Sequence, residues 1–217
     1  MKLHVFPHSP RAFKVLAVAH HLGLDYEFCF CDLTKGATRA PEFAALNPNQ
    51  KMPVLEEGAF KLWESNAIIQ YLAEKNPEAG LIPADAKARA DMAQWMFWES
   101  TTWDRACAIL AFERGVKRVL GLGEPDAAEV ERGLSAFHAA ASILDAHLKG
   151  RRFVSGDRLT LADFAVAADL ILEPFVQLPL EPYAEIRRWG AAMAQLPGWQ
   201  AALALQNGRL ASAEAAA

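Results

Sequence analysis

Two short stretches of the sequence combine residue types that suit the binding of a small zwitterionic peptide. Met52-Pro53 precedes a predicted strand at Val54-Leu55, and Glu64-Ser65 opens a predicted helix that reaches Ala73. An X-Pro bond adopts the cis form at modest cost, and an extended ligand can then pair with the backbone beside it as an added strand. The free N–H groups and dipole of a helix N-terminus favour a carboxylate, which would meet Ser65, while Glu64 would meet an ammonium.

A third candidate, Ser9, stands directly before Pro10 at the start of a predicted helix that ends near Leu22. Serine is a common N-cap and proline suits the first helical position, so capping alone is one interpretation. Its hydroxyl could also donate a hydrogen bond to a ligand thiolate. A free thiol has a pKa of about 8.5, which a helix N-terminus and one donor would lower. With the Met52-Pro53 stretch downstream, we expect Ser9 to have both roles.

The elements that must position these residues read as a small α/β domain. Strand, helix and strand at the N-terminus form a βαβ unit, which implies a parallel pair with a right-handed crossover. A further helix, two strands and a helix follow, in the thioredoxin-like order βαβα-ββα. The expected elements are strands at Lys2–Phe6, Tyr26–Cys31, Val54–Leu55 and Phe60–Trp63, and helices at Pro10–Leu22, Pro41–Leu46 and Ala67–Ala73.

The rest of the chain is predicted to be helical. The Pro- and Gly-containing stretch Asn76–Pro83 is the expected domain boundary. We therefore expect a thioredoxin-like domain at residues 1–76, a linker at 77–84 and an all-helical domain at 85–217. The expected helices are Asp85–Arg118 (one long helix), Asp126–Leu148, Leu161–Leu172, Tyr183–Gln195 and Gly198–Leu205, followed by an alanine-rich tail at Ala211–Ala217 that is expected to fray.

Composition excludes several classes of function. A formal net charge of −4 spread along 217 residues gives no electrostatic footprint for nucleic acid. No run approaches the roughly 20 apolar residues of a membrane span, and the N-terminus lacks a secretory pattern. Three cysteines argue against a disulfide framework and favour a reducing compartment, so we expect a cytoplasmic protein. No Cys/His cluster has metal-binding spacing, so no metal site is expected.

Met52-Pro53, Glu64-Ser65, Ser9 and the late motif Thr160-Leu161-Ala162-Asp163 together resemble the glutathione transferase family, in its order and spacing. The resemblance covers nearly all of the chain and is to a serine-type, phi- or theta-like bacterial member. It implies the family's thioredoxin-like and all-helical domains and glutathione as co-substrate. Thr160 and Asp163 form a capping-box signal whose implied role is folding of the helical domain.

The resemblance also implies roles for individual residues. Ser9 is the catalytic candidate, the Met52 backbone beside Pro53 would pair with the cysteinyl moiety, and Glu64 and Ser65 would hold the γ-glutamyl end. Basic Arg39 and Lys51 fall where serine-type members contact the glycine carboxylate, although both could be ordinary solvated charges. Thr38 stands where some members have histidine, and His8 beside Ser9 is interpreted as a bystander.

The family's long helix lines the acceptor pocket on one side and the dimer interface on the other. Most aromatic residues of that helix are expected to be core, and its acceptor-site candidates are Trp103, Arg105 and Cys107. Trp103 and Cys107 are four residues apart and share a face. An apolar, aromatic pocket suits a hydrophobic electrophile. The resemblance further implies a homodimer.

The predicted activity is therefore attack by glutathione thiolate on a hydrophobic electrophile or a peroxide, as in detoxification. Two alternatives stay open. One is a glutathione-dependent lyase, isomerase or dehalogenase, although the zeta-type Ser-Ser-Cys motif is missing near the N-terminus. The other is a non-catalytic binding protein of the same family. Such members often lose the activating residue or the γ-glutamyl contacts, whereas Ser9, Glu64 and Ser65 are all present.

Overall fold

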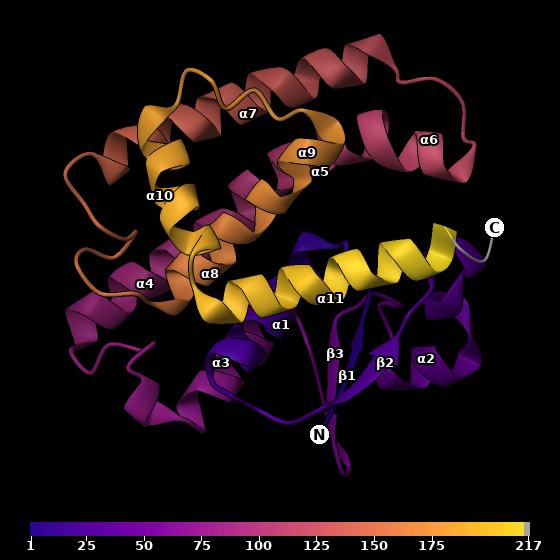
Figure 1. Cartoon of the computed structure of the whole chain (residues 1–217), viewed down its shortest axis with the longest axis horizontal. Coiled ribbons are helices and arrows are strands. Elements are labelled where there is room, and N and C mark those ends of the chain that lie inside the picture. Colours follow the sequence, from indigo (N-terminus) through magenta and orange to yellow (C-terminus); the bar gives the residue numbers. More distant parts are fainter. Residues whose placement is uncertain (215–217) are drawn as a thin grey trace. The chain divides into compact units, whose positions relative to one another are not determined.

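The computed structural model describes residues 1–214, which divide into two compact units (Figure 1). The first unit comprises Met1–Gly80 together with the segment that begins at Ala194 and carries the C-terminal helix. The second unit comprises Leu81–Met193. The predicted helical domain, residues 85–217, includes this C-terminal segment, which instead belongs to the first unit because α11 packs along α1.

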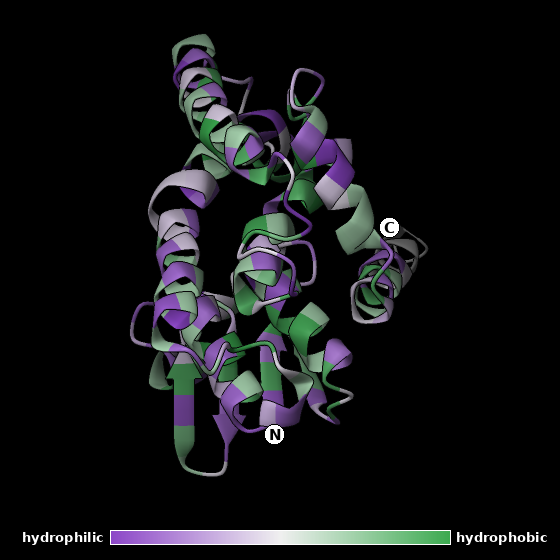
Figure 2. Cartoon of the chain, turned by 90° about the vertical axis from the view of Figure 1, so that its left-hand side faces the viewer, coloured by the Kyte–Doolittle hydropathy of each residue, from purple (hydrophilic) through white to green (hydrophobic). Residues whose placement is uncertain are grey.

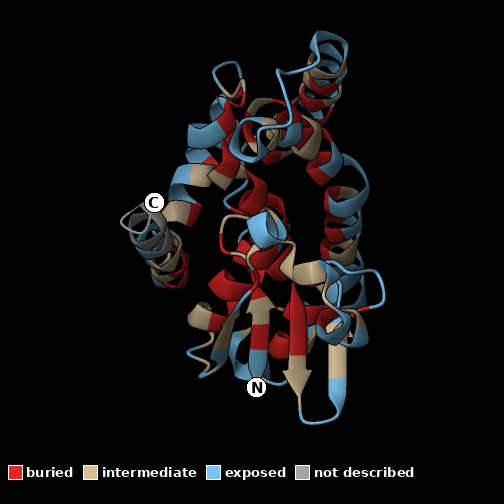
Figure 3. Cartoon of the chain, turned by 90° about the vertical axis from the view of Figure 1, so that its right-hand side faces the viewer, coloured by how far each residue is buried: buried red, intermediate tan, exposed pale blue. Residues whose placement is uncertain are grey.

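A four-stranded sheet with the order β2-β1-β3-β4 forms the centre of the first unit. Strand β1 pairs in parallel with β2 and antiparallel with β3, and β3 and β4 form an antiparallel hairpin. This topology is the predicted βαβ unit followed by a hairpin. Leu3, Val5, Val54 and Leu55 are fully buried, and in Figure 3 β3 is red at its start and tan at its tip. The strands are β1 (Lys2–Val5), β2 (Glu27–Phe30), β3 (Val54–Glu57) and β4 (Phe60–Trp63).

Helices α1 and α3 pack against one another in this unit. Helix α1 is buried at eight consecutive positions from Ala12 to Ala19, because a second helix, α11, covers another of its faces. The helices of this unit before the linker are α1 (Pro10–His21), α2 (Pro41–Leu46) and α3 (Ser65–Glu74), with short 3₁₀ turns at Leu33–Lys35, Ala37–Arg39 and Pro77–Ala79.

The C-terminal helix α11 (Pro197–Glu214) is longer than the predicted Gly198–Leu205 and lies along α1. Gly198 permits this close approach, because a Cβ atom there would lie 2.5 Å from the backbone nitrogen of His21. The rings of Phe13 and Trp199 meet with their centroids 4.8 Å apart. The fraying expected for Ala211–Ala217 concerns a segment whose last three residues, 215–217, lie outside the described residues.

The second unit is helical throughout its core, and Figure 2 shows apolar and polar residues interspersed along its helices, as expected when one face of a helix is buried. The predicted helix Asp85–Arg118 is a run of α-helical segments interrupted by two π-helical turns, at Glu99–Trp103 and Phe112–Val116. The α-helices are α4 (Ala86–Trp98), α5 (Asp104–Ala111), α6 (Lys117–Leu120), α7 (Ala127–Leu148), α8 (Leu161–Ala167), α9 (Glu173–Val176) and α10 (Ala184–Ala194), with a 3₁₀ turn at Ala168–Leu172. Among the described residues, no helix is long and apolar enough to cross a membrane.

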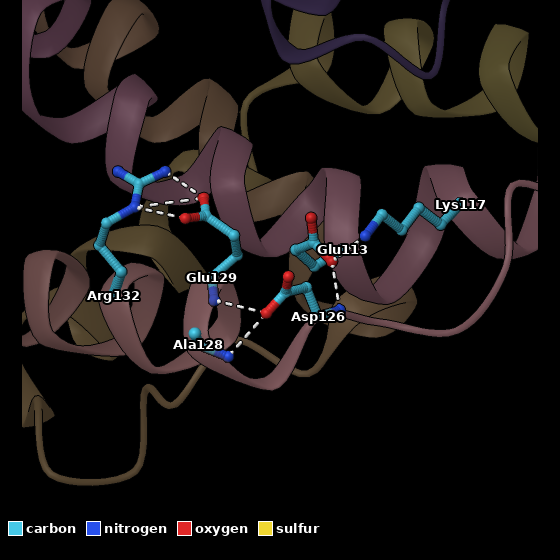
Figure 4. A network of polar contacts seen from close by, with 6 residues as sticks. All are labelled: Glu113, Lys117, Asp126, Ala128, Glu129 and Arg132. Carbon is cyan, nitrogen blue, oxygen red and sulfur yellow. Dashed lines mark hydrogen bonds and ion pairs between the residues drawn. The ribbon is translucent and has the colours of Figure 1, made fainter.

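Acidic side chains cap several helices of this unit. Asp126 accepts hydrogen bonds from the backbone N–H groups of Ala128 and Glu129 at the start of α7, at 2.9 and 3.3 Å (Figure 4). Buried Glu113 accepts from the Asp126 N–H at 2.7 Å and pairs with Lys117 at 2.6 Å, so it fixes the segment that enters α7. Asp85 caps α4 through two backbone N–H groups at 3.0 Å each.

The predicted capping box at Thr160 and Asp163 is present and fully buried. Asp163 accepts from the N–H groups of Val154 and Thr160 at 2.8 and 2.9 Å, from the Thr160 hydroxyl at 3.2 Å and from the Trp189 indole N–H at 3.0 Å. Burial raises the pKa of Asp163, although these donors favour its ionised form. One carboxylate therefore joins α8, the preceding loop and α10.

Replacing this carboxylate should cost more stability than replacing an exposed cap. Asp163→Ala leaves several buried donors without an acceptor, at about 1–3 kcal/mol each, so we expect the free energy of unfolding to fall by about 3 kcal/mol. Asp85→Ala, at an exposed cap with two bonds, is the matched control and should cost about 1 kcal/mol. Urea unfolding of both variants measures the difference. Equal losses would contradict the proposed joining role of Asp163.

Candidate functional site

The register of the sheet brings three of the predicted site segments to one end of the first unit. His4 pairs with Val54, and Val54 pairs with Trp63, so the end of β1, the start of β3 and the end of β4 lie side by side. Ser9 follows β1, Met52-Pro53 directly precedes Val54, and Glu64-Ser65 directly follows Trp63. Residues far apart in the chain thus gather at one edge of the sheet.

The loop before β3 is shaped by buried Asn47, which is not among the predicted site residues. Asn47 donates through Nδ2 to the carbonyl of Lys51 at 2.6 Å and accepts through Oδ1 from the Asn49 N–H at 2.9 Å. The Met52–Pro53 peptide bond is cis. The Met52 side chain packs against the cluster of Cys31, Phe43 and Val54, so it anchors the loop by its apolar part. An asparagine followed by Pro48 reads as an ordinary turn, which is why its role escaped notice.

Glu64 has φ = 71° and ψ = 114°, a conformation that is uncommon for a residue other than glycine. Such a backbone costs about 1–3 kcal/mol and persists only where the surroundings impose it. The Glu64 side chain is exposed and makes no capping hydrogen bond to α3, whereas Ser65, the first residue of α3, is buried. The first turn of α3 therefore begins without a side-chain cap among the described residues.

Ser9 occupies the N-cap position of α1, as predicted, with Pro10 in the first turn. Its carbonyl accepts from the Phe13 N–H at 2.8 Å, but its half-buried side chain makes no capping bond within the described part of the chain. The capping interpretation is therefore correct for position and wrong for the hydroxyl. Next to it, His8 contacts Phe6 and lies 3.3 Å from the Gln206 amide nitrogen, and burial lowers the pKa of His8.

The two basic candidates lie on loops of the same unit. Arg39 is in the 3₁₀ turn Ala37–Arg39, and Lys51 precedes Met52. Both side chains are exposed. Within the described part of the chain, neither side chain makes a hydrogen bond or an ion pair.

The acceptor-site candidates differ in accessibility within the second unit. Trp103 is fully buried, and its indole N–H donates to the Val166 carbonyl at 3.0 Å. Cys107 is also fully buried, whereas Arg105 is exposed. In this structure, Trp103 and Cys107 pack the interior of the helical unit, and Arg105 presents its side chain to solvent.

Three buried carboxylates lie close together near the π-helical turn between α4 and α5. Glu99 and Asp104, five residues apart across the first π-helical turn, approach Asp169, with ligand atoms of all three within 4.8 Å. Burial raises the pKa of the Cys107 thiol well above its ordinary value, and the charges of Asp169, Asp104 and Glu99 raise it further. Cys107 is thus held as a thiol. No sequence motif predicts this group, because Glu99 and Asp104 come together across a π-helical turn and Asp169 is distant in the chain.

Comparison with known proteins matches both units. The model of the "Glutathione S-transferase, N-terminal domain" matches residues 1–74, and that of the C-terminal domain matches residues 127–201. "Glutathione S-transferase 3" of Zea mays is 35% identical over 213 residues, covering 94% of this chain and 93% of its own. The solved structure of glutathione S-transferase III in apo form superposes with a TM-score of 0.83 at 34% identity, covering 94% of this chain and 95% of that one.

A transferase family member from Pseudomonas fluorescens, solved with two glutathione molecules bound, has a TM-score of 0.81 at 25% identity and covers 93% of this chain and 91% of its own. The relatives thus extend over nearly the whole length of the chain, and one of them holds glutathione in its structure. The sequence match to glutathione S-transferase 3 and the structural match to glutathione S-transferase III each cover 94% of this chain.

The burial of the cysteines predicts how they react with Ellman's reagent near pH 8. Burial raises the pKa of Cys31 to about 11 and keeps Cys107 protonated, so neither should react in the folded protein. Cys29 is half-buried, and its pKa is raised mainly by burial and also by the charge of Glu27. It should therefore react slowly near pH 8, and its rate should increase as the pH rises. Unfolded protein, with all three thiols reactive, is the control. Labelling of Cys107 in the native state, mapped by peptide mass, would refute this assignment.

Proposed function

Because the chain belongs to the glutathione S-transferase family, we propose that it is a serine-type member in which Ser9 activates the thiol of glutathione. The protein is a glutathione transferase, and glutathione is the co-substrate that it transfers to an electrophile. One observation carries the serine-type assignment. The Ser9 hydroxyl makes no capping hydrogen bond to α1, and Ser9 follows β1 at the sheet edge where Met52-Pro53 and Glu64-Ser65 also lie.

In this mechanism the Ser9 hydroxyl donates a hydrogen bond to the sulfur of glutathione, and the N-terminus of α1 favours its negative charge. The thiol loses its proton to solvent, and the thiolate attacks the electrophilic carbon. A sulfur–carbon bond forms while the leaving group departs with its electron pair. Ser9 forms no covalent bond, because the attacking atom belongs to the ligand.

The remaining glutathione contacts follow the same edge of the sheet. The Met52 backbone next to the cis bond to Pro53 pairs with the cysteinyl moiety, as an added strand would. Ser65, at the start of uncapped α3, receives the γ-glutamyl carboxylate, and exposed Glu64 receives the ammonium. Exposed Arg39 and Lys51 attract the glycine carboxylate.

The second substrate is a hydrophobic electrophile or a peroxide, and among the acceptor-site candidates Arg105 is the one with an exposed side chain. We assign Trp103 and Cys107 to packing, because their side chains have no exposed surface. Three free cysteines in the described structure support a cytoplasmic location.

The protein is proposed to act as a homodimer. Phe97 on α4 is 71% exposed, the largest exposure among the large apolar side chains described, and such a side chain is a candidate for burial by a second copy. Family resemblance places a dimer interface on this long helix, which supports the same assignment.

Separate loss of binding and activation tests the proposed site. Glu64→Ala removes the partner of the ammonium, so we expect the Kd for glutathione to rise about 30-fold, the effect of a lost charge-assisted hydrogen bond. Ser9→Ala should bind within about threefold of wild type yet lose the ultraviolet absorbance of bound thiolate and about 10²-fold in kcat. Calorimetry and turnover with a chlorinated aromatic acceptor measure these effects. Ser100→Ala, at an exposed serine of the second unit, is the matched control. A wild-type protein that does not bind millimolar glutathione would refute the proposal.

A charged residue at position 97 tests the dimer. Phe97→Glu places a carboxylate in the proposed interface, so light scattering should show a monomer at concentrations where wild type is a dimer. Leu122→Glu changes an apolar side chain that is 55% exposed in the loop after α6, and it should leave the mass unchanged. If both variants keep the wild-type mass, Phe97 lies outside the interface.

A further inference from the structure

Lys14 is a lysine in the middle of the most deeply buried helix of the first unit. Its side chain is 1% exposed, and buried residues flank it on both sides from Ala12 to Ala19. Lysine is almost never buried to this extent unless its ammonium has polar partners. Its position therefore needs an explanation other than helix packing, and the proposed thiol activation by Ser9 does not use it.

The Nζ atom of Lys14 donates a hydrogen bond to Oδ1 of Asn66 at 3.1 Å. Asn66 is the second residue of α3 and directly follows Glu64 and Ser65. Lys14 lies five residues after Ser9 on α1. The bond thus joins the helix that begins at the thiol-activating candidate to the first turn of the helix that begins at the γ-glutamyl candidates.

This first turn depends on contacts from outside its own segment. Its N-cap residue, Glu64, has the strained φ of 71°, and no side-chain cap is present among the described residues. Asn66 is half-buried and accepts a hydrogen bond from a side chain of α1, so this bond ties the first turn of α3, which also contains Ser65, to a second helix. A small displacement of this turn would misplace both groups relative to a bound ligand.

From this geometry we infer that Lys14 is a positioning residue for glutathione, and that it acts through Asn66 to hold the first turn of α3. The inference rests on the proposed γ-glutamyl contacts of Glu64 and Ser65. Lys14 touches neither the reacting sulfur nor the acceptor in this role. It sets the affinity for glutathione, whereas Ser9 sets the reactivity of the thiol.

The chemistry of lysine burial allows this role to be separated from folding. Methionine has nearly the length of lysine and no charge, so it fills the same space, and the lost donor to Asn66 costs about 1–3 kcal/mol, less than the about 5–15 kcal/mol that stabilises a typical domain. Lys14→Met should therefore keep the fold while removing the donor to Asn66. Misplacement of a positioning group by about 1 Å can cost about 10²-fold in rate or affinity.

The experiment compares wild type, Lys14→Met, Asn66→Ala and the double variant by calorimetry with glutathione. Each single variant should raise Kd about tenfold, equivalent to about 1.4 kcal/mol. The double variant should be no weaker than either single, because both changes remove the same bond. The KM for glutathione should rise in parallel, with kcat within about twofold of wild type and the pKa of the bound thiol unchanged, because Ser9 is intact. Lys14→Arg, which keeps a donor, should recover part of the affinity.

Lys75→Met is the matched control, since Lys75 lies at the other end of α3 and pairs with Glu57 at 2.7 Å on the surface. Its Kd should equal that of wild type. Failure of wild type to bind would overturn the proposed function itself. If wild type binds, an unchanged Kd in Lys14→Met, or additive losses in the double variant, would overturn the positioning role. A raised pKa of the bound thiol would do the same, because Lys14 would then act on the sulfur. If Lys14→Met does not fold, Asn66→Ala decides alone through its Kd.

Discussion

Backbone N–H groups at the start of a helix have no partner within the helix and must find acceptors elsewhere. The two units of this protein meet that requirement differently. In the second unit, α4, α7 and α8 are capped by Asp85, Asp126 and the Thr160–Asp163 box, and Asp145 accepts from two N–H groups at the start of α10. In the first unit, no side chain caps α1, α2 or α3 in the part of the chain that the structure describes.

The difference separates stability from binding. In a capped helix, a side chain of the protein already accepts hydrogen bonds from the first N–H groups. A helix without a side-chain cap can bind an anion at its N-terminus instead. Helices α1 and α3, which have no side-chain cap among the described residues, both begin at the sheet edge where His4, Val54 and Trp63 stand in register, so their N-termini lie at the same end of the unit. In the proposed site, the carboxylate of glutathione takes the place of a side-chain cap at the start of α3.

Sequence patterns predicted most of this arrangement because they depend on local chemistry. Pro10 after Ser9, the two strands flanking Gly58 and the Thr160–Asp163 spacing each predict a helix start or a turn from local chemistry, and the structure confirms all three. The βαβ pattern predicted the parallel pair of β1 and β2. The family resemblance added the glutathione transferase fold, which the comparisons confirm.

What escaped prediction depends on contacts between distant segments. Lys14 looks like one polar position in an amphipathic helix, and only the fold shows that it reaches Asn66. The length and place of α11 depend on the close approach of Gly198 to α1, which no local pattern encodes. The π-helical turns also keep the hydrophobic pattern of one long helix. One of them holds Gly115, where a Cβ atom would lie 2.2 Å from the Phe175 ring, so tertiary packing rather than propensity accounts for the absence of a side chain there.

Strain and buried charge coincide at one point of the first unit. Glu64 has an unfavourable backbone conformation. The buried amino group of Lys14 donates a hydrogen bond to Asn66, which is two residues after Glu64 in the chain. Stability alone favours neither feature, because glycine adopts a positive φ without steric cost and a buried ammonium loses its hydration. Proteins retain such features where the surrounding structure enforces them for function. Their convergence on the first turn of α3 supports the proposal that this turn binds the ligand, and this support is independent of the family to which the chain belongs.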